Sequence, residues 1–334
     1  MNNKEMPVVL HWVNSAKGIG VVLVIVGHLL YSSNLQMLNK FIYAFHMPLF
    51  FILSGYVQGK ITNNEYIVKK FRRILLPFIN FAIIGFLSFG LLLLYKGNPL
   101  LVVLIDSFYV LGKISNHPLW FLIVLFETYF FCYLFKINSL NKKKINIWGT
   151  IAFALGGVLY SYPEIMVFSI FGFNRFVICL GFFMFGLFLR RINIEIRYPI
   201  MTLILMTGLT FCFGVILNDK ISIYGFYLGN SYISFLVAAI TGSLAFMCFC
   251  KTFLDFQGYF GNVSKYAILF LGTQYYWIIP FKKIMGLLGL AETWIYDILM
   301  LIFTGLYILF LPVIYRSVSQ IIPLVKYLNG DESK

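Results

Sequence analysis

Long apolar segments separated by short polar ones run along the whole chain. An apolar run of about 18 or more residues with few charges can cross the roughly 30 Å hydrocarbon core of a bilayer as a helix. A transmembrane β-barrel would alternate polar and apolar residues in segments of about ten residues, and these segments do not alternate. The pattern therefore predicts an all-α fold, a polytopic transmembrane helix bundle.

We expect about ten transmembrane helices in a single integral-membrane domain. The segment 98–113 contains Asp106, Gly112 and Lys113, so we interpret it as an outer, partly re-entrant loop and not as an eleventh span. The domain covers residues 1–334, and the expected helices cover residues 13–33, 41–59, 74–95, 119–137, 147–162, 174–190, 198–217, 230–251, 264–281 and 294–316.

Composition excludes a water-soluble protein. Of the 334 residues, 60% are hydrophobic and only 11% are charged, whereas a soluble domain is about one quarter charged. The net charge of +14 is spread over short clusters between apolar segments. A nucleic-acid-binding protein would gather this charge on one soluble module. We therefore expect the lipid bilayer as a partner, and no nucleic acid.

The distribution of Lys and Arg predicts how the bundle is oriented. With the N-terminus in the cytoplasm, nineteen of the 26 basic residues fall in inner segments, which leaves seven for the outer ones. This bias follows the positive-inside rule, and an eleventh span would remove it. We therefore expect both termini in the cytoplasm. The inner basic residues are Lys4, Lys17, Lys60, Lys69, Lys70, Arg72, Arg73, Lys136, Lys142, Lys143, Lys144, Arg190, Arg191, Arg197, Lys251, Lys265, Arg316, Lys326 and Lys334.

The first expected helix carries two ionisable residues, Lys17 and His28. Such residues cost roughly 2.5–3.5 kcal/mol at the centre of a transmembrane helix and are therefore functional candidates. Eleven residues place them within about 20° of one helix face and about 16 Å apart along the axis. This spacing suits a phosphate-bearing donor held at Lys17 whose reactive end reaches His28. The alternatives are that Lys17 snorkels and that His28 bonds a neighbouring helix. No small-residue cleavage site follows this run, so it is a retained helix and not a signal peptide.

The second helix combines His46, Pro48 and the small pair Ser54-Gly55. Pro48 cannot donate a backbone hydrogen bond and so frees the carbonyl of Ala44, which is a usual way to form a polar cavity inside a bundle. His46 is a candidate base, a hydrogen-bond partner of the acceptor, or a cap for the freed carbonyls. The two histidines share no i,i+4 spacing or carboxylate motif, and the five cysteines lie in apolar runs without ligand spacing, so we expect no metal.

These motifs are similar to those of a known family. Lys-x10-His in the first helix, followed by Phe-His-Met-Pro-Leu-Phe-Phe-x-x-Ser-Gly-Tyr in the second, resembles the acyltransferase 3 family of membrane acyltransferases. The closest resemblance is to its fucose 4-O-acetylase-like or polysaccharide O-acetyltransferase branch. It extends to Arg72-Arg73-Ile74-Leu75-Leu76-Pro77 and to Pro118-Leu119-Trp120-Phe121-Leu122. The chain departs from the family pattern at Asn14, where the family usually has Asp, and near Gln274, where it often has His.

The resemblance implies an O-acyltransferase of the cell membrane, most simply an O-acetyltransferase. Acetyl-CoA or another acyl-CoA would be the donor substrate, with no permanently bound cofactor. The acceptor would be a hydroxyl of a cell-surface polysaccharide or of its lipid-linked precursor. Desolvation keeps an intramembrane imidazole neutral, so His28 would act as a general base or, alternatively, as a transient acyl carrier. The residues expected to act in catalysis are Lys17, His28 and His46. Those expected to bind the donor are Lys17, Arg72 and Arg73, which belong to a basic set that also includes Lys69 and Lys70. Those expected to bind the substrate are Ser54, Trp120 and Glu127.

Glu127 lies one heptad after Trp120, on the same helix face, and we expect it to pair with a basic residue more readily than to act in catalysis. Arg175, Gln274 and Asp297 are expected to make polar contacts between helices. The main alternative function is a transporter or flippase of a lipid-linked sugar, which would favour related halves with broken helices at corresponding positions. A purely structural partner of an export assembly would need no single histidine.

Overall fold

The structure, a computed structural model, describes the backbone of residues 10–30, 33, 35–59, 64–108, 119–137, 140–162, 172–192, 196–256 and 258–330. The expectations that concern Lys4, Lys60, Gly112, Lys113, Pro118, Lys334 and the side chain of Asp106 lie outside this description.

The described residues are mainly helical, and the all-α prediction is confirmed. The helices are α1 (His11–Leu29), α2 (Gln36–Tyr56), α3 (Asn64–Lys70), α4 (Leu76–Gly85), α5 (Leu91–Tyr95), α6 (Leu100–Phe108), α7 (Trp120–Leu134), α8 (Lys142–Ser161), α9 (Phe173–Ile192), α10 (Pro199–Phe211), α11 (Tyr232–Phe253), α12 (Tyr259–Val263), α13 (Ala267–Leu287) and α14 (Trp294–Ile321). The π-helical turns η2 (Phe71–Leu75), η3 (Phe86–Gly90) and η7 (Cys212–Ile216) continue α3, α4 and α10, and η8 (Ser264–Tyr266) and η9 (Pro323–Leu328) are 3₁₀ turns.

Each of the ten expected helices overlaps a helix of the structure. Six helical stretches in the described part of the chain are both long and apolar enough to cross a membrane, among them the continuous stretch Asn64–Tyr95. This supports an integral membrane protein, while the number of spans and the cytoplasmic termini stay predictions. Residues expected as an outer loop form α6 instead. At 1.5 Å per residue its nine residues cover only about 14 Å, which is too short to cross the hydrocarbon core.

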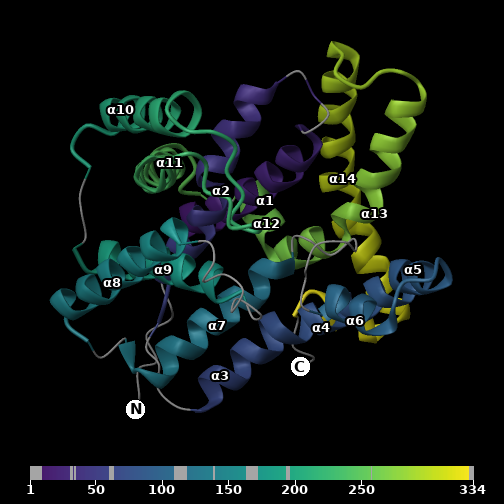
Figure 1. Cartoon of the computed structure of the whole chain (residues 1–334), viewed down its shortest axis with the longest axis horizontal. Coiled ribbons are helices and arrows are strands. Elements are labelled where there is room, and N and C mark those ends of the chain that lie inside the picture. The colour runs from purple at the N-terminus through teal and green to yellow at the C-terminus, as the bar shows by residue number, and fades with distance from the viewer. Residues whose placement is uncertain are drawn as a thin grey trace.

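Helices α1 and α2 lie at the centre of the bundle (Figure 1). Helix α2 packs against α1, α9 and α11, and α1 packs against α12, α13 and α14. Figure 1 shows α8 to α11 on one side of this central pair, α13 and α14 on the other, and α3 to α7 along the lower edge. The two helices that carry the recognisable motifs are therefore surrounded by the rest of the chain.

Glycines bring the central helices into backbone contact. A Cβ atom on Gly55 of α2 would lie 2.0 Å from the carbonyl oxygen of Phe183 in α9, and a Cβ atom on Gly186 of α9 would lie 2.0 Å from that of Ile52. Small residues at such crossings let helices pack closely in lipid, where no hydrophobic driving force holds them together. The Ser-Gly step seen in the sequence is thus half of a reciprocal α2–α9 contact.

Candidate active site

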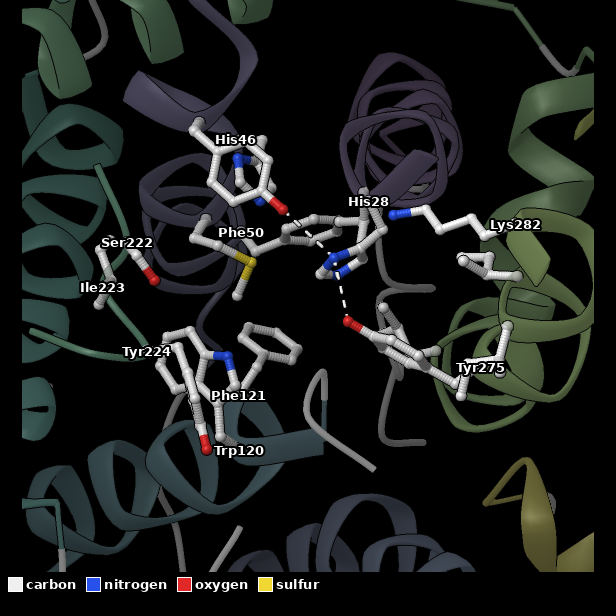
Figure 2. Close-up of a pocket in the computed structure, with 16 residues that line it drawn as sticks. His28, His46, Phe50, Trp120, Phe121, Ser222, Ile223, Tyr224, Tyr275 and Lys282 are labelled. Carbon is white, nitrogen blue, oxygen red and sulfur yellow. Dashed lines mark hydrogen bonds between the residues drawn. The ribbon is translucent and has the colours of Figure 1, made fainter. Parts of the chain in front are cut away.

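A cavity of about 360 Å³ opens between α1, α2, the start of α7, α13 and the loop 217–231 (Figure 2). This volume lies at the lower end of the range for small-molecule pockets, about 300–1,000 Å³. We call it the histidine cavity. Its wall carries two histidines, one lysine and a set of aromatic side chains, namely His28, His46, Lys282, Tyr43, Phe50, Trp120, Phe121, Tyr224 and Tyr275.

His28 is half-buried and lies between two tyrosine hydroxyls. Its Nδ1 is 3.2 Å from Tyr43 Oη of α2 and 3.2 Å from Tyr275 Oη of α13. Figure 2 shows the hydrogen bond between His28 and Tyr275 as a dashed line. The rings of His28 and Tyr275 also pack together, with centroids 5.2 Å apart. The next helix in sequence, α2, and the distant helix α13 therefore fix the imidazole, which directs its Nε2 edge away from the tyrosine pair.

His46 is buried and its tautomer is set by the backbone. Nδ1 of His46 lies 2.8 Å from the carbonyl oxygen of Ile42, one turn earlier in α2. Because a carbonyl oxygen only accepts, Nδ1 must carry the proton, and the lone pair of the neutral ring is on Nε2. Of the three predicted roles, His46 thus does cap a carbonyl, although it is that of Ile42 and not the one freed by Pro48. The lone pair on Nε2 leaves the other two roles open.

The loop 217–231 forms one wall of the cavity and is held by Asn218. The buried side-chain oxygen of Asn218 accepts from the backbone N–H groups of Asp219, Asn230 and Ser231 at 3.1, 2.6 and 3.2 Å. Lys40 of α2 pairs with Asp219 of this loop at 3.0 Å. These contacts place a short run of the loop, residues 222–224, in the cavity wall.

The guanidinium of Arg175 in α9 packs on the ring of Tyr224. It lies 4.7 Å from the centroid of the Tyr224 ring, and that ring lies 6.4 Å from the ring of Trp120. Glu127 acts electrostatically on Arg175, which agrees with the predicted preference for a basic neighbour. In the described part of the chain the two side chains form no ion pair within 4 Å, and Glu127 does not line the cavity.

A second polar group of residues lies toward the other end of α1, and we call it the lysine cluster. It contains Lys17, Lys70, Tyr129 of α7 and Ser54. The Lys70 ammonium lies 3.6 Å from the centroid of the Tyr129 ring, the hydroxyls of Tyr129 and Ser54 are hydrogen-bonded, and Lys17 interacts electrostatically with both Tyr129 and Lys70. Within the described residues no carboxylate lies within 4 Å of either ammonium. Two ammonium groups thus share this site, and none of the described carboxylates forms an ion pair with them.

The predicted site residues therefore separate into two groups. His28, His46 and Trp120 line the histidine cavity, while Lys17 and Ser54 belong to the lysine cluster. Arg72 and Arg73 are exposed on η2, which directly follows Lys70, and Arg73 acts electrostatically on Lys70. A π-helical turn at this position is noteworthy because such turns are frequent at functional sites.

A family model described as an acyltransferase domain matches residues 10–315, most of the chain. The chain belongs to the acyltransferase 3 family. It is accordingly a membrane acyltransferase. No curated protein and no solved structure matches it.

The geometry of this acyltransferase suits transfer to a hydroxyl. A neutral imidazole can accept the proton of an attacking hydroxyl through the nitrogen that carries the lone pair, and the histidine cavity holds two such rings beside aromatic walls. The described residues contain no group of three or more His, Cys, Asp or Glu side chains placed to hold a metal ion. Proton transfer is a chemistry that the two histidines of the cavity offer.

The sequence analysis did not identify several residues that line the histidine cavity. Tyr43 precedes His46 by one helical turn, so its position was readable, but nothing marked its hydroxyl as a partner of His28. Tyr275 follows Gln274 and is 247 residues from His28 in sequence. Lys282 and the wall segment 222–224 belonged to segments without a motif. The one nearby feature of the sequence was the departure from the family pattern at Gln274, the residue before Tyr275.

Proposed function

We propose that this acyltransferase moves an acyl group, acetyl in the simplest case, from cytoplasmic acyl-CoA to a hydroxyl of a cell-surface polysaccharide or of its lipid-linked precursor, in the cell membrane. The observation that carries this proposal is the placement of Lys17 in the lysine cluster and of His28 in the histidine cavity, on one helix. Eleven residues separate them by about 16 Å. Acyl-CoA has phosphates at one end and a thioester at the end of a long arm, so it matches the two sites in order.

The lysine cluster is the proposed binding site for the donor phosphates. Lys17 and Lys70 lie beside each other with no carboxylate within 4 Å in the part of the chain that the structure describes. Phosphate oxygens form charge-assisted hydrogen bonds with ammonium groups and would relieve the repulsion between these two. Arg73, which acts on Lys70, extends the positive region toward the predicted cytoplasmic surface.

The histidine cavity is the proposed place of reaction. Nε2 of His28 takes the proton of the acceptor hydroxyl while the oxygen attacks the thioester carbonyl carbon. The C–S bond then breaks, the ester remains on the acceptor, and the CoA sulfur leaves as a thiolate that takes up the proton. Tyr43 and Tyr275 hold Nδ1 in place. With the proton on Nδ1 donated to these hydroxyl oxygens, the lone pair is on Nε2, as the reaction requires.

His28 can alternatively carry the acyl group itself. In that sequence Nε2 attacks the thioester first, CoA leaves, and the acceptor hydroxyl takes the acyl group from an acyl-imidazole. The two sequences share the same nitrogen and differ in whether CoA leaves before the acceptor binds. Rapid quenching of a mixture of protein and radiolabelled acetyl-CoA without acceptor distinguishes them, because only the second leaves label on the protein.

The deciding experiment measures donor use by the purified protein in lipid nanodiscs. With acetyl-CoA and an extract of surface glycan or lipid-linked precursor, we expect release of CoA and transfer of labelled acetate to the glycan fraction, and we expect neither from His28→Ala. A transporter or flippase would move labelled lipid-linked sugar across vesicles without consuming acetyl-CoA. Mass spectrometry and NMR of the surface polysaccharide from cells with and without the gene would then show an ester-labile acyl group only when the gene is present.

A further inference from the structure

His28 lies in the C-terminal turn of α1, and buried side chains of two other helices bind the backbone carbonyls on either side of it. Asn39 Nδ2 of α2 donates to the carbonyl oxygen of Gly27 at 2.9 Å. Tyr296 Oη of α14 donates to that of Leu29 at 2.7 Å. The side chains of Asn39 and Tyr296 are buried, at 4% and 0% exposure. The backbone of His28 is thus bound immediately before and immediately after the residue.

The end of a helix cannot hold its own backbone in this way. The last four carbonyls of an α-helix have no N–H partner within the helix, and the final turn tends to fray. In α1 these four carbonyls begin at Val26 and include that of His28. The N–H group of Leu30 binds the carbonyl of Val26, and the two buried side chains bind two more. The turn that presents the imidazole is therefore held largely by side chains from outside the helix.

Each of the two donors has a defined place in its own helix. Asn39 precedes Tyr43 by one turn of α2. The same face of α2 therefore binds the backbone of α1 through the Asn39 amide and the ring of His28 through the Tyr43 hydroxyl. On α14, the backbone N–H group of Tyr296 donates to the side chain of Thr293, which caps the helix. The two contacts thus tie the end of α1 to two separate helices.

The start of α14 also holds the segment that follows α1. The hydroxyl of Ser33 donates to the carboxylate of Asp297, the residue after Tyr296, and accepts a hydrogen bond from the backbone N–H group of Leu35. The chain is therefore bound to the first turn of α14 both within the last turn of α1 and shortly after it.

We propose that Asn39 and Tyr296 are positioning residues for acyl transfer: by binding the carbonyls on either side of His28, they hold its Nε2 where the acceptor hydroxyl reacts. This inference rests on the proposed function, in which that nitrogen takes the proton. Proton transfer needs the two heavy atoms within about 2.6–3.2 Å of each other, and a displacement of about 1 Å can lower a rate by about 100-fold. Fraying of the last turn of α1 would leave the protein folded but slow.

Two conservative substitutions test this proposal. Tyr296→Phe removes one oxygen atom, and Asn39→Leu replaces the amide by an apolar side chain of similar size, so each leaves one carbonyl beside His28 without its donor. We expect each variant to lower kcat for acyl transfer by at least about fivefold. The KM for acyl-CoA should stay within about twofold of that of the unmodified protein, because the lysine cluster is unchanged. Steady-state release of CoA by the purified variants in nanodiscs measures both constants, and thermal melting curves establish that each variant is folded.

Tyr307→Phe is the matched control. Tyr307 is also a buried tyrosine of α14, and its hydroxyl donates to the carbonyl oxygen of Phe270 in α13 at 3.1 Å. The substitution therefore removes a buried bond of the same kind that does not involve α1. We expect the kcat of Tyr307→Phe to stay within about twofold of that of the unmodified protein. If Tyr307→Phe and Tyr296→Phe lower kcat by the same factor, the Tyr296 hydroxyl stabilises the bundle in general and the proposal is wrong.

Solid-state NMR of the protein with isotope-labelled histidine ring nitrogens reports the placement of His28 independently of turnover. The signals of His28 are those that disappear in His28→Ala. Its Nδ1 lies beside two tyrosine hydroxyls, so a displaced ring changes these hydrogen bonds and shifts the Nδ1 signal. We expect a shift in Asn39→Leu and in Tyr296→Phe, but not in Tyr307→Phe. Unchanged His28 signals in both test variants would overturn the proposal, and Tyr296→Phe decides alone if Asn39→Leu does not fold.

The two readouts separate failure of this proposal from failure of the proposed function. Acetyl transfer that is insensitive to both Asn39→Leu and Tyr296→Phe refutes the positioning role and keeps the proposed function. A protein that shows the shifted His28 signals but never releases CoA keeps the placement of His28 by the two contacts and refutes the acyl-CoA reaction. If His28→Ala transfers acetyl at the normal rate, His28 is not the base, and the positioning role is refuted with it.

Discussion

The histidine cavity and the lysine cluster are assembled in different ways at the two ends of α1. The cavity takes side chains from four helices and a loop, fixes one imidazole through two tyrosine hydroxyls, and is walled by aromatic rings. The cluster gathers two ammonium groups around the Tyr129 ring. The first arrangement orients a proton acceptor, whereas the second concentrates positive charge. In the proposed function, chemistry and donor binding are physically separate, so variants should affect kcat at one end and KM at the other.

The largest effect is expected at the cavity. A general base contributes typically 10²–10⁴-fold, so His28→Ala and His28→Asn should lower kcat for acyl transfer by at least about 100-fold. The KM for acyl-CoA should change little, because the donor phosphates are held elsewhere. Steady-state release of CoA by the purified variants measures both constants.

The variant His46→Ala provides a comparison for the loss of activity in His28→Ala. The imidazole of His46 is committed to the Ile42 carbonyl, so His46→Ala should lose less activity than His28→Ala. If His28→Asn acylates at the normal rate while Lys17→Ala does not, the assignment of the base is wrong. His46, whose lone pair is on Nε2, then becomes the leading candidate.

At the lysine cluster the effect should appear in KM. Lys17→Ala removes one of two cations that meet the donor phosphates and should raise the KM for acyl-CoA by about tenfold, since hydrogen bonds to charged groups contribute roughly 1.5–3 kcal/mol. The kcat value should stay within about threefold of that of the unmodified protein. Lys17→Arg should keep most of the affinity because it retains the charge. Lys70→Ala should resemble Lys17→Ala, whereas Lys69→Ala, an exposed neighbour, should not. Unchanged kinetics in Lys17→Ala would reduce this residue to a snorkelling lysine.

The tyrosine pair tests whether positioning of His28 can be separated from its chemistry. Tyr43→Phe and Tyr275→Phe each remove one hydroxyl from Nδ1 and should lower kcat by about three- to tenfold, in line with about 1 kcal/mol per hydrogen bond. The double variant should lose more than either single one, with KM for acyl-CoA unchanged. Tyr276→Phe is the matched control because its hydroxyl contacts Ser88 and not His28. An effect of Tyr276→Phe equal to that of Tyr275→Phe would point to general destabilisation of α13.

These predictions also show what the sequence could and could not provide. Helical periodicity placed Lys17 and His28 on one face of one helix, and the family motif singled out His46 and Trp120, because these relations are local in sequence. The contact of Tyr275 with His28 spans 247 residues, and no periodicity within one helix can indicate which distant helix packs against it. Glu127 was expected among the substrate-binding residues, which stays a prediction. The structure places it near Arg175 and not among the residues that line the histidine cavity, because a shared face with Trp120 does not determine which neighbour that face meets further along.

The smallest effect is expected at the loop 217–231, where Lys40 pairs with Asp219. The hydrogen bond from Lys40 is the main reason that the pKa of the Asp219 carboxyl lies below its ordinary value. A lowered pKa means that the pair contributes to loop order above the ordinary carboxyl value and is lost as pH falls through the lowered one. Exposed pairs contribute little, so Lys40→Met should change activity by less than about twofold at pH 7. Hydrogen exchange of the 217–231 amides should become faster in the variant at pH 7 and converge with the unmodified protein in acid.

Helix α1 is locked against its neighbours by glycines. A Cβ atom on Gly18 would lie 1.9 Å from the carbonyl oxygen of Phe260, and one on Gly20 would lie 2.9 Å from the ring of Phe50. In the proposed function, the segment between Lys17 and His28 thus sets a fixed distance for the arm of the donor. Inserting one residue there would lengthen this distance by only about 1.5 Å but would turn His28 by about 100° around the helix, away from its tyrosines. We therefore expect related proteins to tolerate substitutions within residues 18–27, whereas an insertion or deletion of a single residue there should abolish the transfer.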